Sequence, residues 1–489
     1  MAAILSCPSK LQVYRPRRPE KTVLFQIIKR HYKTWHRNEN AKNPVPSYVD
    51  KEFKKYLECG ILAKGFACAH CEGCNKDFLI AYSCKGRGIC PSCNTRTMVE
   101  TAAHLVENLI PCVPNRQWVI SFPLRIRHYL QTPKILQNVL RIVIDEIRKR
   151  LIACSPNASH PQIGAISFIQ NFGNSLNVHP HFHIIAADGI FCGDNADLKF
   201  YEAYLTLDDI ADTQDAIQRR VLKMFCRRGW FDKESIDKML AYENSGFSLD
   251  AKVKVESWDR EGLERLIRYC ARPPFASENL RMHGSLLVYR FPKPSHTGQT
   301  YTQLTPLDFI EKIVALIPPP HRHRRHYHGV FAPNFPMRTK VAANAKNRPE
   351  AFTPGMNEAA DKVKKVSLNW AMLIARIYKT DPLICTSCGK KITILSFVTQ
   401  PEEIRRILRE IIWPLDPPEF DQPYELDHWN ICQLVPGTPD GFPQDIWQVD
   451  FDTGPDPPWE EMHDSLYEGE EYIDPPHEKE IVDPLHWEE

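Results

Sequence analysis

A histidine pair inside an apolar strand, His181-Phe182-His183, constrains this chain more than any other feature. Side chains alternate between the two faces of a strand, so His181 and His183 project to one side while Phe182 points to the other. The strand continues as residues 184–187 (IIAA), a run typical of a buried central strand, where histidine is costly unless it has a partner. We therefore expect these two imidazoles to share one divalent cation.

A second strand is expected to supply a further metal ligand. The apolar run 163–172 ends in a Gly-Asn-Ser turn before the histidine strand, which predicts a hairpin. If Phe172 pairs with His179, Gln170 faces His181 on the same side of the sheet. An amide oxygen suits Mg²⁺ or Mn²⁺, so Gln170 is the favoured third ligand and His179 is the alternative.

Residues 257–274 have the pattern of an amphipathic helix that contains Tyr269. Ser257 is expected to cap this helix and Pro273-Pro274 to end it. Apolar residues at i, i+3, i+4 and i+7 form one stripe, with Tyr269 at its edge in the last turn. Three arginines surround the tyrosine in the sequence and are expected to contact DNA: Arg265, Arg268 and Arg272. Together with the histidine strand upstream, this setting favours a nucleophile over a core tyrosine.

Seven of the 16 cysteines lie between residues 59 and 93. Two Cys-x-x-Cys pairs there have the spacing of a four-thiolate zinc site: Cys71 with Cys74, and Cys90 with Cys93. A full set of thiolates leaves no open position, which indicates a structural ion. Cys84 is an alternative to one of the four. The loop between the pairs, residues 75–89, is expected to form a strand pair.

Two later motifs are interpreted as structural or as contacts to nucleic acid. Cys385-x-x-Cys388 has no second pair after it, so we interpret it as a tight turn or a degenerate metal site. Residues 321–328 (HRHRRHYH) are too basic for a core and predict a loop that faces DNA. The cations expected to contact DNA in this loop are Arg322, Arg324 and Arg325.

Charge is distributed unevenly along the 489 residues, which carry 62 Lys or Arg and 60 Asp or Glu. Residues 416–489 hold 22 of the acids and a single base, Lys479, so this tail carries about −21 and residues 1–415 carry about +23. A body this basic is expected to bind a polyanion. The acidic, Pro-rich tail is expected to be disordered, and either competes with nucleic acid for the body or only aids solubility.

Several segments together resemble the rolling-circle transposases of the insertion sequence 91 family, within the HUH endonuclease superfamily. They are 59–98 (zinc-binding domain), 116–123 and 163–191 (catalytic sheet), 263–281 (tyrosine helix), 318–338 (basic block) and 370–412 (the family's ending). The resemblance implies that Tyr269 attacks a phosphodiester of single-stranded DNA at element ends, leaving a 3′-hydroxyl and a 5′-phosphotyrosine. Arg265 occupies the place of a first tyrosine, so the chain resembles the single-tyrosine branch.

We expect an α+β fold with a zinc-ribbon-like N-terminal module and a ferredoxin-like (HUH) antiparallel-sheet catalytic domain, since strand, helix, strand and strand follow one another from residue 117 to 191. Cofactors are expected to be structural Zn²⁺ and catalytic Mg²⁺ or Mn²⁺. The expected divisions are 1–50 (basic arm), 51–110 (zinc-binding domain), 111–285 (catalytic domain), 286–415 (basic region) and 416–489 (disordered acidic tail).

Two other functions are compatible with these motifs. One is a zinc-dependent DNA-binding regulator without catalysis, and the other is a plasmid relaxase or replication initiator that uses the same chemistry. The chain has no apolar stretch of membrane-spanning length and no convincing signal peptide. We therefore expect a cytoplasmic, nucleoid-associated protein whose cysteines are thiols or metal ligands rather than disulfides.

Overall fold

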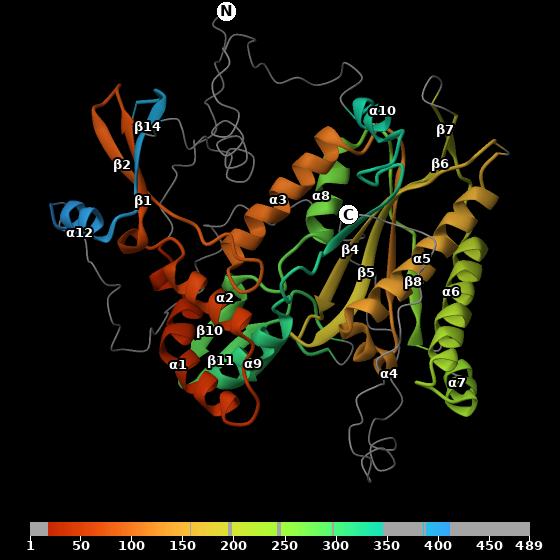
Figure 1. Ribbon diagram of the computed structural model, residues 1–489, viewed down its shortest axis with the longest axis horizontal. Helices are drawn as coiled ribbons and strands as arrows, with labels where there is room; N and C mark the ends of the chain where they lie inside the picture. The colour runs from red at the N-terminus through yellow and green to blue at the C-terminus, as the bar shows by residue number, and fades with distance from the viewer. Residues whose placement is uncertain are drawn as a thin grey trace, which may run out of the picture.

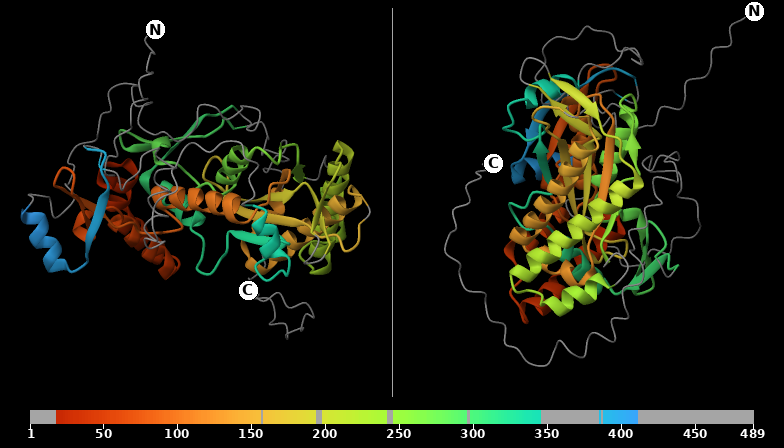
Figure 2. Two further views of the ribbon diagram at one scale, coloured as in Figure 1. Left: turned by 90° about the horizontal axis from the view of Figure 1, so that it is seen from above. Right: turned by 90° about the vertical axis from the view of Figure 1, so that its right-hand side faces the viewer.

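The computed structural model describes residues 18–345, apart from 157, 194–197, 242–245 and 296–297, together with 385 and 388–410. Its elements form an elongated molecule, with a central sheet toward one end and the small elements of residues 392–410 at the other (Figure 2). The expected disordered tail, 416–489, lies outside the described residues.

An antiparallel sheet carries the histidine strand at its centre. Its strands lie in the order β13–β4–β5–β3–β8, and β9 also pairs with β3. Their bounds are β3 (Asn115–Ser121), β4 (Gly164–Phe172), β5 (Val178–Ala187), β8 (Ser248–Asp250), β9 (Lys254–Val255) and β13 (Arg325–Gly329). With α5 (Pro133–Ala153) and α6 (Leu207–Arg227), the series β3–α5–β4–β5–α6–β8 forms a βαββαβ unit, the arrangement of a ferredoxin-like fold.

Helices α5 and α6 cover one face of this sheet (Figure 1). Phe182 points into this face, is fully buried, and packs edge-on against Phe122 with ring centroids 5.2 Å apart. Thr132 precedes α5 and Pro133 occupies its first turn, where proline's missing N–H costs nothing. Two short helices accompany this layer, α4 (Leu124–Arg127) and α7 (Lys233–Leu240).

The opposite face of the sheet is covered by α3 (Pro91–Asn108) and α8 (Arg260–Cys270), with α10 (Arg338–Ala343) beside them (Figure 1). Apolar side chains of α8, such as Leu263 and Ile267, pack there against β4 and β5. Because side chains alternate along β5, the histidines lie on this face, under α8.

The start of α8 differs from the prediction. The helix begins at Arg260, and its cap is Asp259, whose carboxylate accepts a 2.7 Å hydrogen bond from the backbone N–H of Gly262. The expected cap, Ser257, was therefore wrong. Aspartate satisfies the same orphan N–H groups as serine and adds a charge that the helix dipole favours.

A second packed unit lies beside the central sheet, where the red helices adjoin a green sheet and helix (Figure 1). Its core joins residues near the start of the described chain with residues between 275 and 317, including Leu24, Phe53, Leu287 and Phe309. Residues 23–40 of the expected basic arm are thus part of this packed unit. Its elements are α1 (Val23–Asn40), α2 (Ser47–Glu58), β10 (Leu280–His283), β11 (Leu286–Arg290), β12 (Tyr301–Leu304) and α9 (Pro306–Leu316).

A third, small unit contains β1 (Phe66–Cys71) and β2 (Lys76–Ala81), which form an antiparallel hairpin. The strand pair expected within residues 75–89 is therefore wrong. The partner of β2 is β1, which lies outside that range and ends at Cys71. Residues from far along the chain complete this unit: β14 (Ile392–Val398) pairs with β1, and α12 (Pro401–Glu410) packs beside it (Figure 1).

The basic block, residues 321–328, is a loop only in its first half, 321–324. Residues Arg325–Gly329 form β13, which pairs with β4 at the edge of the central sheet. His328 Nε2 lies 3.0 Å from Ser167 Oγ, and burial lowers the pKa of His328 to about 3. The backbone of β13 pairs with the edge of the central sheet, although this pairing partly buries polar side chains. The sequence pattern alone did not reveal this pairing.

Replacing Phe182 with alanine should destabilise the protein by about 3–5 kcal/mol, because it opens a cavity in the core between the sheet and α5. Chemical denaturation followed by circular dichroism measures this loss. Metal binding by the folded variant should persist, since the side chain points away from the histidines. A change below about 1 kcal/mol would contradict the packing described for β5.

Candidate active site

His181 and His183 lie side by side on β5 with ring centroids 5.0 Å apart. They are 5% and 0% exposed, and β4 and β3 flank them on either side. Burial lowers the pKa of His181 to about 4 and that of His183 well below its usual value. Both imidazoles are therefore neutral at physiological pH, which is the state that binds a metal ion.

The tautomer of His181 is fixed by its own strand. Its Nδ1 lies 2.9 Å from the backbone oxygen of His179. A carbonyl can only accept a hydrogen bond, so Nδ1 carries the proton and Nε2 is the nitrogen with a lone pair. A backbone acceptor at one ring nitrogen is the arrangement that orients metal-ligating histidines in proteins.

Gln170 of β4 pairs directly with His181, as the sequence predicted. A register shift follows, so Phe172 pairs with Val178 and not with His179 as expected. The side-chain amide of Gln170 donates to two backbone oxygens at the end of α8, those of Tyr269 at 3.2 Å and Cys270 at 2.8 Å. These acceptors fix the orientation of the amide, because only its NH₂ group can donate.

The oxygen at the other end of that amide has no partner within the part of the chain that the structure describes. Gln170 Oε1 is buried and accepts no hydrogen bond from any described residue, and the same is true of His179 Nε2. A buried acceptor left without a donor costs free energy unless a ligand or ion satisfies it. With two neutral imidazoles beside it, this donor set fits a divalent cation such as Mg²⁺ or Mn²⁺.

Tyr269 reaches the same place from α8. Its ring stands edge-on to that of His183, with centroids 5.4 Å apart and an interplanar angle of 86°. Burial raises the pKa of the Tyr269 phenol, and the positive charge of Arg272 opposes that shift. The structure therefore brings together the two histidines, Gln170 and the tyrosine, which are separated by up to 99 residues in sequence.

Of the three arginines predicted to surround Tyr269, Arg272 is the one in contact with it. The guanidinium carbon of Arg272 lies 5.0 Å from the tyrosine ring centroid. The other two lie on outer turns of α8 and form ion pairs within the helix, Arg265 with Glu261 and Arg268 with Glu264. All three arginines are close to residue 269 in sequence. Of the three, Arg272, which lies just beyond the end of the helix, is the one whose side chain lies against the tyrosine ring.

Gln117 of β3 is a site residue that the sequence analysis missed. Its amide nitrogen lies 3.0 Å from Nδ1 of His183 and 3.5 Å from Sγ of Cys270, so it links the histidine strand to the tyrosine helix. If the amide is turned over, its oxygen accepts the Nδ1 proton of His183 and leaves Nε2 unprotonated for a metal. A glutamine inside the apolar strand RQWVISFP was the signal that could have identified it.

The arginines of the basic block make contacts within the protein. Arg322 donates to the backbone oxygen of Gln131, and Arg324 donates to that of Arg87. Arg325 donates a 2.6 Å hydrogen bond to Thr101 Oγ1 on α3. These three side chains join separate segments of the fold, and their role in DNA binding remains a prediction.

The cysteines form two separate groups rather than the single predicted site. The first cysteine cluster is Cys59, Cys84, Cys90 and Cys93, and the second cysteine cluster is Cys71, Cys74, Cys385 and Cys388. The expected set of Cys71, Cys74, Cys90 and Cys93 is wrong, because the first two lie at the tip of the β1–β2 hairpin. The first cluster lies at the base of that hairpin, about 20 Å away for a six-residue strand.

The first cysteine cluster has the features of a structural zinc site. Its sulfur atoms lie 3.4–3.7 Å apart where the separations are resolved, and all four lie within 4.8 Å of one another. Backbone N–H groups of Cys84 and Gly86 each donate to a cysteine sulfur at 3.3 Å. Cys90 caps α3, whose positive N-terminal dipole stabilises thiolates.

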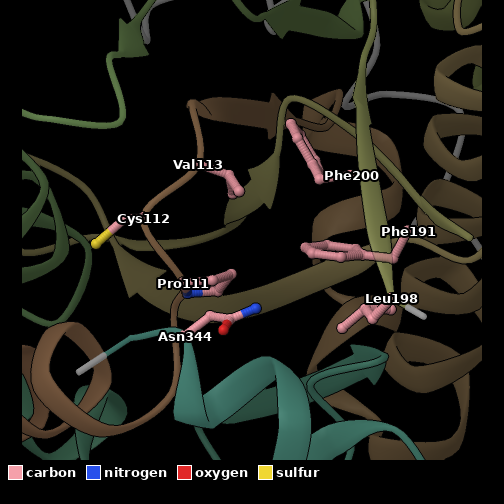
Figure 3. A pocket seen from close by; sticks show the side chains of 7 residues that line it. All are labelled: Pro111, Cys112, Val113, Phe191, Leu198, Phe200 and Asn344. Carbon is pink, nitrogen blue, oxygen red and sulfur yellow. The ribbon is translucent and has the colours of Figure 1, made fainter. Parts of the chain in front are cut away.

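A pocket lies near the C-terminal end of β5 (Figure 3). It involves the turn after α3 and the small hairpin of β6 (Gly189–Cys192) and β7 (Lys199–Glu202). Mostly apolar side chains line it: Pro111, Cys112, Val113, Phe191, Leu198, Phe200 and Asn344. None of the histidines, Gln170 or Tyr269 contributes to it, so it is separate from the candidate active site.

Two family models match the chain. One, described as a transposase zinc-binding domain of insertion sequence 91, matches residues 27–122 and contains the whole first cysteine cluster. The other, described as a putative transposase, matches residues 164–339 and contains both histidines and Tyr269. Within the described residues, no helix combines the length and apolar character needed to cross a membrane.

A curated relative agrees with these matches. The transposase for insertion sequence element IS801 of Pseudomonas savastanoi pv. phaseolicola is 21% identical over 366 residues, which cover 71% of this chain and 83% of the relative. No solved structure matches the chain. The zinc-binding module and the transposase region together define a transposase, an enzyme class that cleaves DNA. The chain belongs to the transposase family of insertion sequence 91.

Changing Gln117 to leucine should weaken Mn²⁺ binding by about 10–100-fold, the usual effect of removing a hydrogen-bond partner of a metal-ligating histidine. Isothermal titration calorimetry with Mn²⁺ measures it. Gln117→Glu, which keeps an acceptor for the Nδ1 proton of His183, should retain binding. Equal affinities for the wild type and the leucine variant would contradict an orienting role.

Proposed function

We propose that this transposase nicks and rejoins single-stranded DNA at the ends of its element, with Tyr269 as the nucleophile. The observation that carries the proposal is the contact between the Tyr269 ring and His183, 5.4 Å between centroids, on the face of the sheet that also holds His181 and Gln170. The resemblance to HUH endonucleases supports single-stranded DNA as the substrate and the rolling-circle pathway.

In the proposed step, one bond to phosphorus forms as another breaks. The Tyr269 oxygen loses its proton to solvent and attacks the scissile phosphorus. The bond from phosphorus to the 3′ oxygen breaks, and that oxygen takes up a proton from solvent and leaves as a 3′-hydroxyl. The DNA 5′ end stays on the enzyme as a phosphotyrosine ester. The ester conserves the energy of the broken bond, so rejoining to a second 3′-hydroxyl requires no nucleotide cofactor.

Arg272 is suited to help both the tyrosine and the phosphate. Its guanidinium lies against the Tyr269 ring and against the ring of Phe172, at 5.0 and 5.3 Å. Its Nε is buried and has no hydrogen-bond acceptor among the described residues. The charge favours a phenolate, and the unused donor fits a phosphate oxygen of the bound strand.

The divalent cation would be held by His181, His183 and Gln170, with His179 as the alternative to Gln170. Such an ion polarises the scissile phosphate and offsets the charge that develops in the transition state. The protein residues supply orientation: His179 fixes the tautomer of His181, and Gln170 ties its strand to the backbone of Tyr269 and Cys270. Gln170 is therefore proposed to position the nucleophile and to bind the cation as well.

Two alternative functions fit less well. A plasmid relaxase or replication initiator would use the same chemistry, but the match to the transposase zinc-binding domain favours transposition. A regulator without catalysis would not need a buried Gln170 oxygen that accepts no hydrogen bond from the described residues. It would also not need a tyrosine ring in contact with His183.

Changing Tyr269 to phenylalanine should abolish the covalent adduct with a labelled single strand from an element end, because only the attacking oxygen is lost. DNA affinity should be nearly unchanged. Denaturing gels measure the adduct and fluorescence anisotropy measures the affinity. Tyr327→Phe, on the edge strand β13, is the matched control and should retain the adduct. An adduct that persists in Tyr269→Phe would overturn the assignment of the nucleophile.

Changing His181 or His183 to alanine should suppress cleavage and weaken Mn²⁺ binding, since each removes a ligand. Gln170→Ala and His179→Ala identify the third ligand, because the one that binds the ion should show the larger loss of Mn²⁺ affinity. Calorimetry and nicking assays on the same preparations provide the comparison. Unchanged Mn²⁺ affinity in the double histidine variant would remove the metal site on β5.

A further inference from the structure

We propose that the second cysteine cluster binds a second structural zinc ion, which fastens the segment containing β14 and α12 to the N-terminal zinc-binding domain. Two of its ligands, Cys71 and Cys74, lie inside the residues matched by the zinc-binding family model, 27–122. The other two, Cys385 and Cys388, lie far outside that range. The inference goes beyond the proposed DNA cleavage and does not depend on it.

The positions of the four sulfur atoms fit a tetrahedral ion. Cys71 Sγ lies 3.4 Å from Cys388 Sγ, and Cys74 Sγ lies 3.4 Å from Cys385 Sγ, with all four sulfurs within 4.8 Å of one another. Zinc–sulfur bonds of about 2.3 Å in a tetrahedron place neighbouring sulfurs about 3.8 Å apart. A disulfide needs about 2.0 Å and involves two sulfurs, whereas four converge here.

The two Cys-x-x-Cys motifs are followed by residues of the same backbone conformation. In each, the residue after the second cysteine has a left-handed backbone: Asn75 with φ 51° and Gly389 with φ 70°. Asparagine and glycine are the residues that adopt this conformation most readily. In the later turn, the Gly389 N–H donates to the Cys385 oxygen at 2.8 Å, which closes the loop around the sulfurs. Each turn thus presents two sulfurs to one point.

The turns are also packed against each other. A Cβ added to Gly73, in the first turn, would lie 2.3 Å from the side chain of Lys390, just after the second turn. Pairing of β1 with β14 continues to the cysteines, where Cys71 lies opposite Ile392. The lysine stem therefore lies against the first turn.

Apolar packing alone gives this segment modest support. Leu395 and Phe397 of β14 are 64% and 70% exposed, and the core between this sheet and α12 contains few buried side chains, Phe66, Val398, Ile404 and Leu408. The ligand pairs are 311 and 317 residues apart in sequence, so bringing them together costs conformational entropy. An ion shared by both turns supplies the binding free energy that offsets this cost.

The test measures zinc per chain in full-length protein purified under reducing conditions, by atomic emission and native mass spectrometry. We expect two zinc ions in the wild type and one in the double variant Cys385→Ser/Cys388→Ser, with circular dichroism unchanged because the first cluster and its core remain. Trypsin should also cut the variant faster at Lys390 and Lys391, since the segment is released.

Two further variants serve as controls. Cys226→Ser, at an exposed cysteine of α6 outside both clusters, should keep the zinc content and protease resistance of the wild type. Cys388→His changes an exposed ligand to another zinc ligand and should retain the second ion. If the double serine variant holds as much zinc as the wild type, the second site does not exist and the inference is overturned.

Discussion

The side chain of Gln170 is the connection on which the candidate active site depends. It sits opposite His181 in the sheet and donates both amide protons to backbone oxygens at the end of α8. These two bonds set the distance between the histidine strand and the last turn of the helix, and therefore the contact of Tyr269 with His183. They also leave Oε1 as a buried acceptor toward the site, so one residue connects the position of the nucleophile with the capacity to bind a cation.

The rest of the fold is arranged so that this connection is rigid. The βαββαβ unit buries the apolar face of β5 under α5 and α6, which leaves the histidine face to α3 and α8. Gln117 adds a second link between the same strand and helix through His183 and Cys270. At the N-terminus, the first cysteine cluster fixes the start of α3, the helix that lies beside α8, so a structural ion and the candidate active site share one layer of the molecule.

Elements with strong local signals could be predicted from the sequence. The helix expected between the strands of residues 117–191 is α5, and the pairing of Gln170 with His181 followed from the alternation of side chains along two strands. Long-range partners could not be predicted in this way. The spacing Cys-x-x-Cys indicates that two sulfurs point together, but not which second pair meets them. Cys385 and Cys388 were therefore interpreted as a tight turn or a degenerate metal site, and the first pair was given the wrong partners. The loop predicted for residues 325–328 was wrong for a related reason, because composition does not show that a neighbouring strand edge is available for pairing.

The most direct test of the central claim is the site of DNA attachment in the wild-type protein. After reaction with a single strand from an element end in Mn²⁺, the protein is digested with trypsin and nuclease and sequenced by mass spectrometry. Cleavage after Arg268 and Arg281, with Arg272 protected by the following proline, gives a peptide from Tyr269 to Arg281 that contains a single tyrosine. The account predicts a residual nucleotide on Tyr269 of that peptide. A nucleotide on another residue, such as Tyr327, or no adduct despite measurable nicking, would contradict it.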